Sequence, residues 1–265
     1  MLAIIGCGWL GTEIAEQLIK KKILRSREII VTRRNEKKLK ELKNKLGVQI
    51  TTNNKEAVSK AETIILAVRP QQIAGVLKEI KPVAGNKLFI SIAGGLDLKF
   101  FESFLPGVPL SRVMPNPLIS SNGGSTGYSK NKFCNSKCEK EIKTLFEPLC
   151  ENLVEVKESQ MNTFTTIASC SSSLFYYTYN SLIELSKEHN FDENTAKKII
   201  LLSAKASAEH AIKSNESLSE MINEACTPGG MTIDGINYLN EKKVNESVKK
   251  AAEKIIERAE KINSK

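Results

Sequence analysis

The chain has 265 residues, of which 41% are hydrophobic and 26% charged, a balance that excludes a disordered chain, a collagen-like repeat and a small disulfide scaffold. Its formal net charge is +9, which raises nucleic acid, an anionic membrane surface or an anionic ligand as partners. Between residues 20 and 45 there are 12 basic and 3 acidic residues, so the excess is local, unlike that of a polycation that coats nucleic acid.

The first half of the chain alternates short apolar runs with helical stretches, which predicts a parallel sheet covered by helices on both faces. The strands are predicted at 2–5, 29–32, 48–50, 63–68, 88–92, 111–114 and 153–156. Helical spacing is found at 9–19, 35–45, 71–80 and 136–150, and residues 120–127 are expected to form a loop. Beyond residue 160 only helical patterns occur, at 161–188, 193–213, 216–225, 232–240 and 244–263. We therefore expect an α/β fold, with an N-terminal doubly wound Rossmann domain at residues 1–158 and an all-α domain at residues 159–265.

A glycine motif of the form G-x-G-x-x-G follows the first strand and opens the first helix, as Gly6-Cys7-Gly8-Trp9-Leu10-Gly11. In that context Gly6 permits a tight turn, Gly8 lets the backbone approach a pyrophosphate, and Gly11 allows close packing of helix on strand. The unpaired N–H groups of the helix start, at Trp9 and Leu10, then face the phosphates. The motif predicts a dinucleotide site.

The end of the second predicted strand indicates which dinucleotide is bound. A site for NAD usually has a carboxylate there for the ribose 2′-hydroxyl, whereas this chain has Arg33 and Arg34. Guanidinium groups bind a 2′-phosphate through charge-assisted hydrogen bonds. NADP is therefore favoured over NAD, and the lysines that follow are interpreted as a solvated helix face.

Two further segments lie where open α/β sheets bind ligands, at the carboxyl ends of strands. Val68, Arg69 and Pro70 end the fourth predicted strand, and Asn116 follows the run at 111–114. We expect all four residues to contribute to the cofactor site.

Membrane insertion and metal binding are not expected. No run reaches the roughly 20 apolar residues that a bilayer requires, and residues 1–11 lack the basic leader of a signal peptide. The six cysteines are scattered and have no matching histidine set, which favours reduced thiols over a zinc site. These patterns predict a cytoplasmic protein with no metal, no membrane partner and no nucleic-acid partner.

The chain resembles the pyrroline-5-carboxylate reductase family over nearly its whole length. The resemblance rests on the glycine motif, on Leu66-Ala67-Val68-Arg69-Pro70-Gln71, on Arg112-Val113-Met114-Pro115-Asn116, and most specifically on Thr227-Pro228-Gly229-Gly230-Met231-Thr232. It implies reduction of 1-pyrroline-5-carboxylate to L-proline by NAD(P)H. It also implies a helical C-terminal domain that dimerises, with active sites at the dimer interface.

The segment at 227–232 is the predicted substrate site. Gly229 and Gly230 precede a helix whose free N–H groups and dipole favour an anion, so they are expected, with Met231, to bind the substrate carboxylate. The resemblance implies that the Thr232 hydroxyl bonds the imine nitrogen and relays a proton. Ser171 is a further candidate for substrate contact, although a serine at a helix start is also an ordinary cap.

Two segments depart from the family pattern. Residues 169–175 read Ser-Cys-Ser-Ser-Ser-Leu-Phe where the family typically has Ser-Gly-Ser-Gly-Pro-Ala-Tyr, and Met231 replaces a smaller residue in the segment at 227–232. Two alternatives therefore stay open beside the main prediction: a reductase of another small imino or keto acid, and a regulatory protein that senses NADP without turnover. In each case the partners expected are a small molecule and a second copy of the chain.

Overall fold

The computed structural model describes residues 1–121 and 123–263. The chain divides into two compact units, one formed by Met1–Ser169 with Ile255–Lys265 and the other by Cys170–Lys254. The last helix, α12 (Val244–Asn263), therefore contributes to both units. The domain division predicted at residues 158 and 159 stays a prediction.

The first unit contains one eight-stranded sheet in the order β3-β2-β1-β4-β5-β6-β7-β8. Its strands are β1 (Leu2–Ile5), β2 (Ile29–Thr32), β3 (Gln49–Thr51), β4 (Thr63–Leu66), β5 (Leu88–Ser91), β6 (Leu110–Met114), β7 (Ser125–Lys130) and β8 (Asn152–Glu155). All neighbouring strands are parallel except β6 and β7. The strand order reverses between β1 and β4, which places a ligand crevice at their carboxyl ends.

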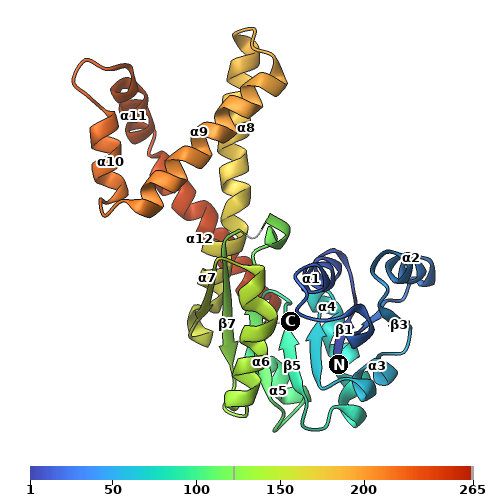
Figure 1. Ribbon diagram of the computed structural model, residues 1–265. Coiled ribbons are helices and arrows are strands. Elements are labelled where there is room, and N and C mark those ends of the chain that lie inside the picture. The colour runs from blue at the N-terminus through green and yellow to red at the C-terminus, as the bar shows by residue number, and fades with distance from the viewer. Residues whose placement is uncertain (122, 264–265) are drawn as a thin grey trace. The chain divides into compact units, whose positions relative to one another are not determined.

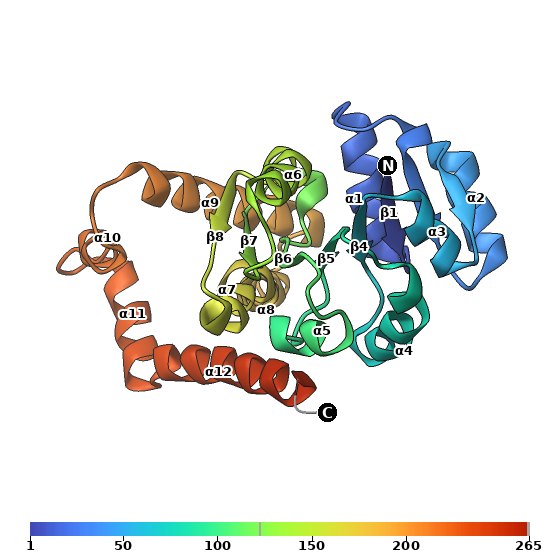
Figure 2. The same cartoon turned by 90° about the horizontal axis from the view of Figure 1, so that it is seen from below.

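Helices cover both faces of this sheet, as Figure 2 shows for α1 and α6 on one side and for α4 and α5 on the other. The helices of the unit are α1 (Trp9–Lys20), α2 (Glu36–Leu46), α3 (Asn54–Lys60), α4 (Pro70–Ile80), α5 (Leu98–Phe104), α6 (Ser136–Phe146) and α7 (Met161–Thr165). Short 3₁₀ turns lie at Ser26–Glu28, Lys81–Val83, Ile119–Ser121, Glu147–Leu149 and Glu158–Gln160. Apolar side chains of α1, α2 and α6 fill one core layer, and those of α3, α4 and α5 fill the other. The predicted doubly wound fold is confirmed (Figure 1).

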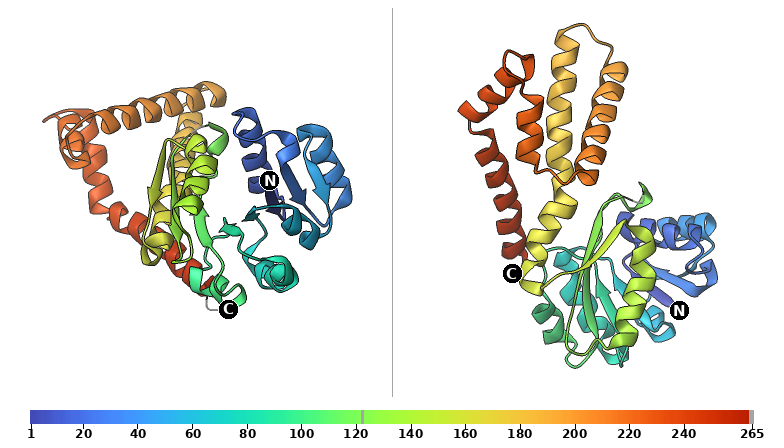
Figure 3. Two further views of the ribbon diagram at one scale, coloured as in Figure 1. Left: turned by 60° about the horizontal axis from the view of Figure 1, so that its bottom comes forward. Right: turned by 60° about the vertical axis from the view of Figure 1, so that its left-hand side comes forward.

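The second unit is entirely helical. It comprises α8 (Ser171–Glu188), α9 (Glu193–Lys213), α10 (Leu218–Ala225), α11 (Met231–Glu241) and the first part of α12. Helices α8 and α9 pack against one another (Figure 3). Many large apolar side chains of these helices are exposed in the single chain: Phe175, Tyr176, Tyr177, Leu182, Leu185, Ile199, Leu202, Ile212, Leu218 and Tyr238. Within the described residues, no helix is both long and apolar enough to cross a membrane.

Two expectations about local structure were wrong. The loop expected at 120–127 contains the start of β7, and its Asn122 lies outside the described residues. Gly127 pairs with Met114 and Val154 in that strand, and an added Cβ there would stand 2.5 Å from Phe164 Cδ1. Close packing thus accounts for Gly127, whereas Gly124 has φ +80°, a backbone conformation that favours glycine.

The helix expected over 161–188 is interrupted by a π-helical turn at Thr166–Cys170. Where α7 meets this turn, the hydroxyl of Thr165 donates to the Met161 carbonyl (2.7 Å) and that of Thr166 to the Asn162 carbonyl (3.0 Å). Threonine hydroxyls that bond backbone carbonyls four residues back bend helices, which is a physical reason for an interruption at this position.

The C-terminal end of α12 packs on the first unit at Gly95, where we expect the sequence to tolerate no side chain. Gly95 has φ +84°, and an added Cβ would lie 2.9 Å from Ile262 Cβ and 3.0 Å from the Ala259 carbonyl oxygen. We predict that Gly95→Ala lowers the free energy of unfolding by about 2–3 kcal/mol, from strain and overpacking together. Gly85→Ala is the control, since Gly85 has φ +52° and open space around it. Thermal unfolding that finds the two variants equally stable would contradict this packing.

Candidate functional site

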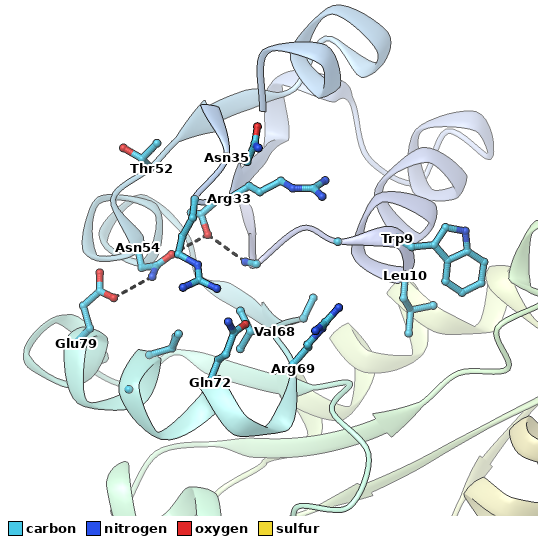
Figure 4. A pocket seen from close by; sticks show the side chains of 17 residues that line it. Trp9, Leu10, Arg33, Asn35, Thr52, Asn54, Val68, Arg69, Gln72 and Glu79 are labelled. Carbon is cyan, nitrogen blue, oxygen red and sulfur yellow. Dashed lines mark hydrogen bonds between the residues drawn. The ribbon is translucent and has the colours of Figure 1, made fainter. Parts of the chain in front are cut away.

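A cavity of about 1070 Å³ lies beside the glycine turn, at the carboxyl ends of β1, β2 and β4. Figure 4 shows side chains from the first helix, from the end of β2, from α3 and from α4 around it. The cavity is lined by Gly6, Gly8, Trp9, Leu10, Thr32, Arg33, Arg34, Asn35, Thr52, Asn54, Ala67, Val68, Arg69, Gln72, Gly75, Val76 and Glu79. This is the crevice at which doubly wound sheets bind dinucleotides.

The three glycines of the motif have three different surroundings. Gly6 has φ +79°, and a Cβ there would lie 2.0 Å from Val68 Cγ1. A Cβ on Gly8 would meet only the Gly6 carbonyl oxygen at 3.8 Å, so the backbone is open on its cavity side. A Cβ on Gly11 would be 3.1 Å from Ala67 Cβ and from Ile4 Cγ2, which shows that this glycine serves packing. The turn thus leaves the room that a pyrophosphate needs at the start of α1.

Cationic groups gather around the cavity. Arg33 and Arg34 come from the end of β2, Arg69 comes from the end of β4, and Glu79 is the one carboxylate among the lining residues given above. Arg33 Nη1 donates to the Cys7 carbonyl oxygen (3.2 Å), and Figure 4 shows its side chain extending from the strand end in the direction of Trp9. These residues suit a dinucleotide with an additional phosphate on its ribose.

Cys7 lies within the glycine turn, but it is buried and does not line the cavity. It is fully buried, and its Sγ lies 3.5 Å from Thr12 Oγ1. Burial raises the pKa of this thiol, against smaller opposing effects of Thr12 and Arg33. Cys7 is therefore a protonated packing residue at neutral pH.

A chain of hydrogen bonds connects the glycine turn to the far wall of the cavity. The Gly6 N–H donates to Thr32 Oγ1 (3.1 Å), and that hydroxyl donates to Asn54 Oδ1 (2.7 Å). Asn54 Nδ2 in turn donates to Glu79 Oε2 (2.9 Å), as the dashed lines of Figure 4 show. Sequence reasoning missed Thr32, Asn54 and Glu79, although Thr32 ends β2 and Asn54 follows β3 at the same carboxyl edge as the motif.

We predict that Thr32→Val weakens NADPH binding about tenfold while Thr32→Ser changes it less than about threefold. Valine keeps the shape of threonine but leaves the Gly6 N–H without its acceptor, and a lost hydrogen bond of this kind is worth about 1–2 kcal/mol. Equilibrium titration followed by the fluorescence of Trp9, the single tryptophan, measures the effect. Equal affinities for the valine and serine variants would rule out this role of the hydroxyl.

Some residues predicted for the cofactor site do not line the cavity. Gly11 packs against the sheet, and Pro70 is the first residue of α4. Asn116 is 8% exposed, and its amide donates to the Ala168 carbonyl (2.7 Å) while its Oδ1 accepts from the Leu118 N–H (2.9 Å). The side-chain amide of Asn116 thus binds the π-helical turn to the end of β6.

The residues predicted for the substrate belong to the second unit. Gly230 is the N-cap of α11, and Met231 and Thr232 form its first turn, where Met231 is 95% exposed. Gly229 has φ +79°, and a Cβ on Gly230 would lie 2.6 Å from Thr227 Oγ1. The segment therefore presents free backbone N–H groups at a helix start. Ser171 is the first residue of α8.

The described residues contain no group of three or more His, Cys, Asp or Glu side chains placed to hold a metal ion.

A doubly wound sheet with a glycine turn, cationic strand ends and an appended helical unit defines the class of dinucleotide-dependent oxidoreductases. Comparison with known proteins agrees with this class and extends it. Residues 1–95 match the family model described as NADP oxidoreductase coenzyme F420-dependent, and residues 158–262 match the one described as pyrroline-5-carboxylate reductase dimerisation.

Relatives that align over nearly their full length are named pyrroline-5-carboxylate reductases. The chain is 28% identical to the pyrroline-5-carboxylate reductase of Corynebacterium melassecola, over 98% of both chains. It is 26% identical to that of Methanosarcina acetivorans, over 100% of this chain and 98% of the relative. A crystal structure of Plasmodium falciparum pyrroline carboxylate reductase with NADP bound superposes with a TM-score of 0.91 at 26% identity, over 99% of this chain and 97% of that one. Over nearly its whole length the chain is therefore similar to pyrroline-5-carboxylate reductases, and its helical C-terminal part matches their dimerisation domain, which supports homo-oligomerisation.

Proposed function

We propose that this protein reduces 1-pyrroline-5-carboxylate to L-proline with NADPH. The observation that carries the proposal is the cavity at the switch point of the sheet, with its open Gly8 backbone and arginines, in a chain similar to this family. The proposal includes the division into a cofactor-binding domain at residues 1–158 and a helical domain at residues 159–265.

The residues of the first unit bind and orient the cofactor. The backbone N–H groups of Trp9 and Leu10 at the start of α1 receive the pyrophosphate, and Arg33 and Arg34 receive the 2′-phosphate. When bound, the reduced nicotinamide supplies the hydride. Guanidinium groups in place of the carboxylate that binds a free 2′-hydroxyl favour NADP over NAD.

The start of α11 is the proposed substrate site. Free N–H groups after Gly230 and the positive end of the helix dipole bind the substrate carboxylate. The Thr232 hydroxyl is the proposed partner of the imine nitrogen, with Met231 beside it and Ser171 as a further contact. A pyrrolinium nitrogen can arrive already protonated, so the protein's main task is to orient the substrate.

We infer that the homo-oligomer is at least a homodimer formed by the helical unit. Exposed apolar side chains such as Tyr177, at 79%, and Ile212, at 80%, are far more numerous on its helices than a surface in water favours. The six cysteines are free, in keeping with the reducing cytoplasm that the sequence predicts.

A second candidate function follows from residues 169–175, where the chain departs from the family pattern. A serine-rich segment in place of the glycines and proline typical of the family favours a different small imino or keto acid. A protein that senses NADP without turnover is the remaining alternative.

One assay separates these functions. Purified protein is mixed with NADPH and 1-pyrroline-5-carboxylate, and the absorbance of the reduced nicotinamide is followed while product is identified by chromatography. Prompt oxidation with formation of proline supports the proposal. Turnover only with other cyclic imines or keto acids supports the second reductase, and tight NADPH binding without any turnover supports the sensor.

A further inference from the structure

The net charge of the protein is concentrated in one short segment. Residues 20–45 contain 12 basic and 3 acidic side chains, a net charge of +9. The rest of the chain then has 39 − 12 = 27 basic and 30 − 3 = 27 acidic residues, so it is neutral. The electrostatic field of this chain at long range therefore originates from this segment.

The segment leads directly to the cavity. It runs from the end of α1 through β2 to α2, and Arg33 and Arg34 at the end of β2 line the cavity. A second hollow of about 490 Å³ shares Gly8, Trp9 and Arg33 with the cavity. Its charged lining is balanced, with Lys38 and Lys45 of α2 beside Arg33 and the carboxylates of Glu13, Glu16 and Glu41. Helix α2 thus borders the mouth of the dinucleotide site through this hollow.

Three exposed lysines of α2, at positions 37, 40 and 43, line neither the cavity nor the second hollow. Within the part of the chain that the structure describes, Lys37, Lys40 and Lys43 have no carboxylate within 4.0 Å, whereas Lys45 pairs with Glu16 at 2.5 Å. Their charges are therefore not neutralised locally. We call these three residues the α2 lysine face.

Helix stability does not account for this face. Lys43 lies in the last turn of α2, where a positive charge is favourable, but Lys37 is in the first turn, where the helix dipole opposes it. Glutamate would be the stabilising choice at that position. The helix dipole thus accounts for Lys43 but not for Lys37.

We propose that the α2 lysine face steers the anionic dinucleotide into the cavity. This inference rests on the proposed function, since the ligand is NADPH. Its pyrophosphate and 2′-phosphate together carry a charge of about −4 near neutral pH, against about −2 for NADH. Attraction over a distance on the order of 10 Å raises the association rate constant at low ionic strength, because the ligand is guided before contact. The dissociation rate constant is unaffected, because the three lysines do not line the occupied cavity.

The test compares two triple variants by stopped-flow binding of NADPH, followed by the fluorescence of Trp9. The first is Lys37→Gln/Lys40→Gln/Lys43→Gln. The matched control is Lys99→Gln/Lys137→Gln/Lys140→Gln, which removes the same charge from exposed positions that line neither hollow. Association and dissociation rate constants are measured at low salt and at high salt, with NADPH and with NADH.

At low salt the α2 variant is expected to bind NADPH about five- to tenfold more slowly, with a dissociation rate constant within twofold of wild type. The reduction is expected to be smaller for NADH, to disappear at high salt and to be absent in the control variant. An unchanged association rate constant, an equal loss in the control variant, or a loss confined to dissociation would each overturn the inference.

The alternative ligand of the α2 lysine face is a polyanion such as single-stranded nucleic acid. Binding of a single-stranded oligonucleotide at physiological salt that is lost in the α2 variant, with NADPH association unchanged, would replace steering by nucleic-acid binding. The outcomes for the proposed function are separate. A protein that does not bind NADPH at all contradicts the proposed function, whereas normal turnover with unchanged association rates contradicts steering alone.

Discussion

Replacing Arg33 and Arg34 together by alanine is expected to weaken NADPH binding about 100-fold and NADH binding less than about threefold. A charge-assisted hydrogen bond contributes about 1.5–3 kcal/mol, so two such bonds to the 2′-phosphate correspond to about two orders of magnitude in affinity. NADH has a hydroxyl at that position and loses neither bond. Titration of both dinucleotides against both proteins measures the ratio.

The control for this prediction is Arg25→Ala/Arg27→Ala, which removes two exposed arginines of the same basic segment that do not line the cavity. It is expected to leave both affinities within about twofold. Equal losses for NADPH and NADH in the Arg33/Arg34 variant would refute the 2′-phosphate assignment. The single variants are informative as well, because Arg33 also holds the Cys7 carbonyl, and its loss is expected to affect both dinucleotides slightly.

The second large effect is expected at a buried ion pair in the first unit. Arg112 on β6 is 2% exposed, and its Nη1 lies 2.6 Å from Oε1 of Glu158, which is 29% exposed. Glu158 Oε1 also accepts from the Leu98 N–H (2.9 Å), and its Oε2 accepts from the hydroxyl of Ser129. The Glu158 carboxylate, which lies just before α7 in the chain, therefore bonds to residues of β6, of β7 and of the start of α5.

We predict that Glu158→Leu lowers the free energy of unfolding by about 3–5 kcal/mol, because it leaves a buried guanidinium without its counter-ion. The double variant Arg112→Met/Glu158→Leu is expected to regain at least half of that loss, since no isolated charge is then buried. Urea unfolding of the wild type, both single variants and the double variant completes the cycle. Strictly additive losses would contradict a coupled pair.

Much of the fold was predictable from local patterns. Continuous apolar runs at residues 2–5, 29–32 and 63–68 gave buried parallel strands, because a strand covered on both faces has no polar side. The helices of the second unit were located within two or three residues of their observed ends, apart from the π-helical turn. Two short helices, α3 and α5, were missed, since seven residues give too little periodicity to detect.

The candidate site was predictable only where adjacent residues define it. The turn at residues 6–11 and the arginines at the end of β2 are short-range features, and the structure brings both to one cavity. Asn116 follows a strand, and its amide is hydrogen-bonded within the chain to Ala168 and Leu118. A cofactor contact of this residue stays a prediction.

By itself, the sequence determined the features that depend on neighbouring residues: the glycine turn, the cationic strand end, the strand and helix periods, and the charge concentrated at residues 20–45. Only the tertiary structure decided which distant side chains meet. Thr32, Asn54 and Glu79 form one chain of hydrogen bonds, and Arg112 reaches Glu158, across 22 to 46 positions of sequence. Hydrogen bonds and ion pairs act over about 3 Å, so the packing of the sheet and its helices selects their partners.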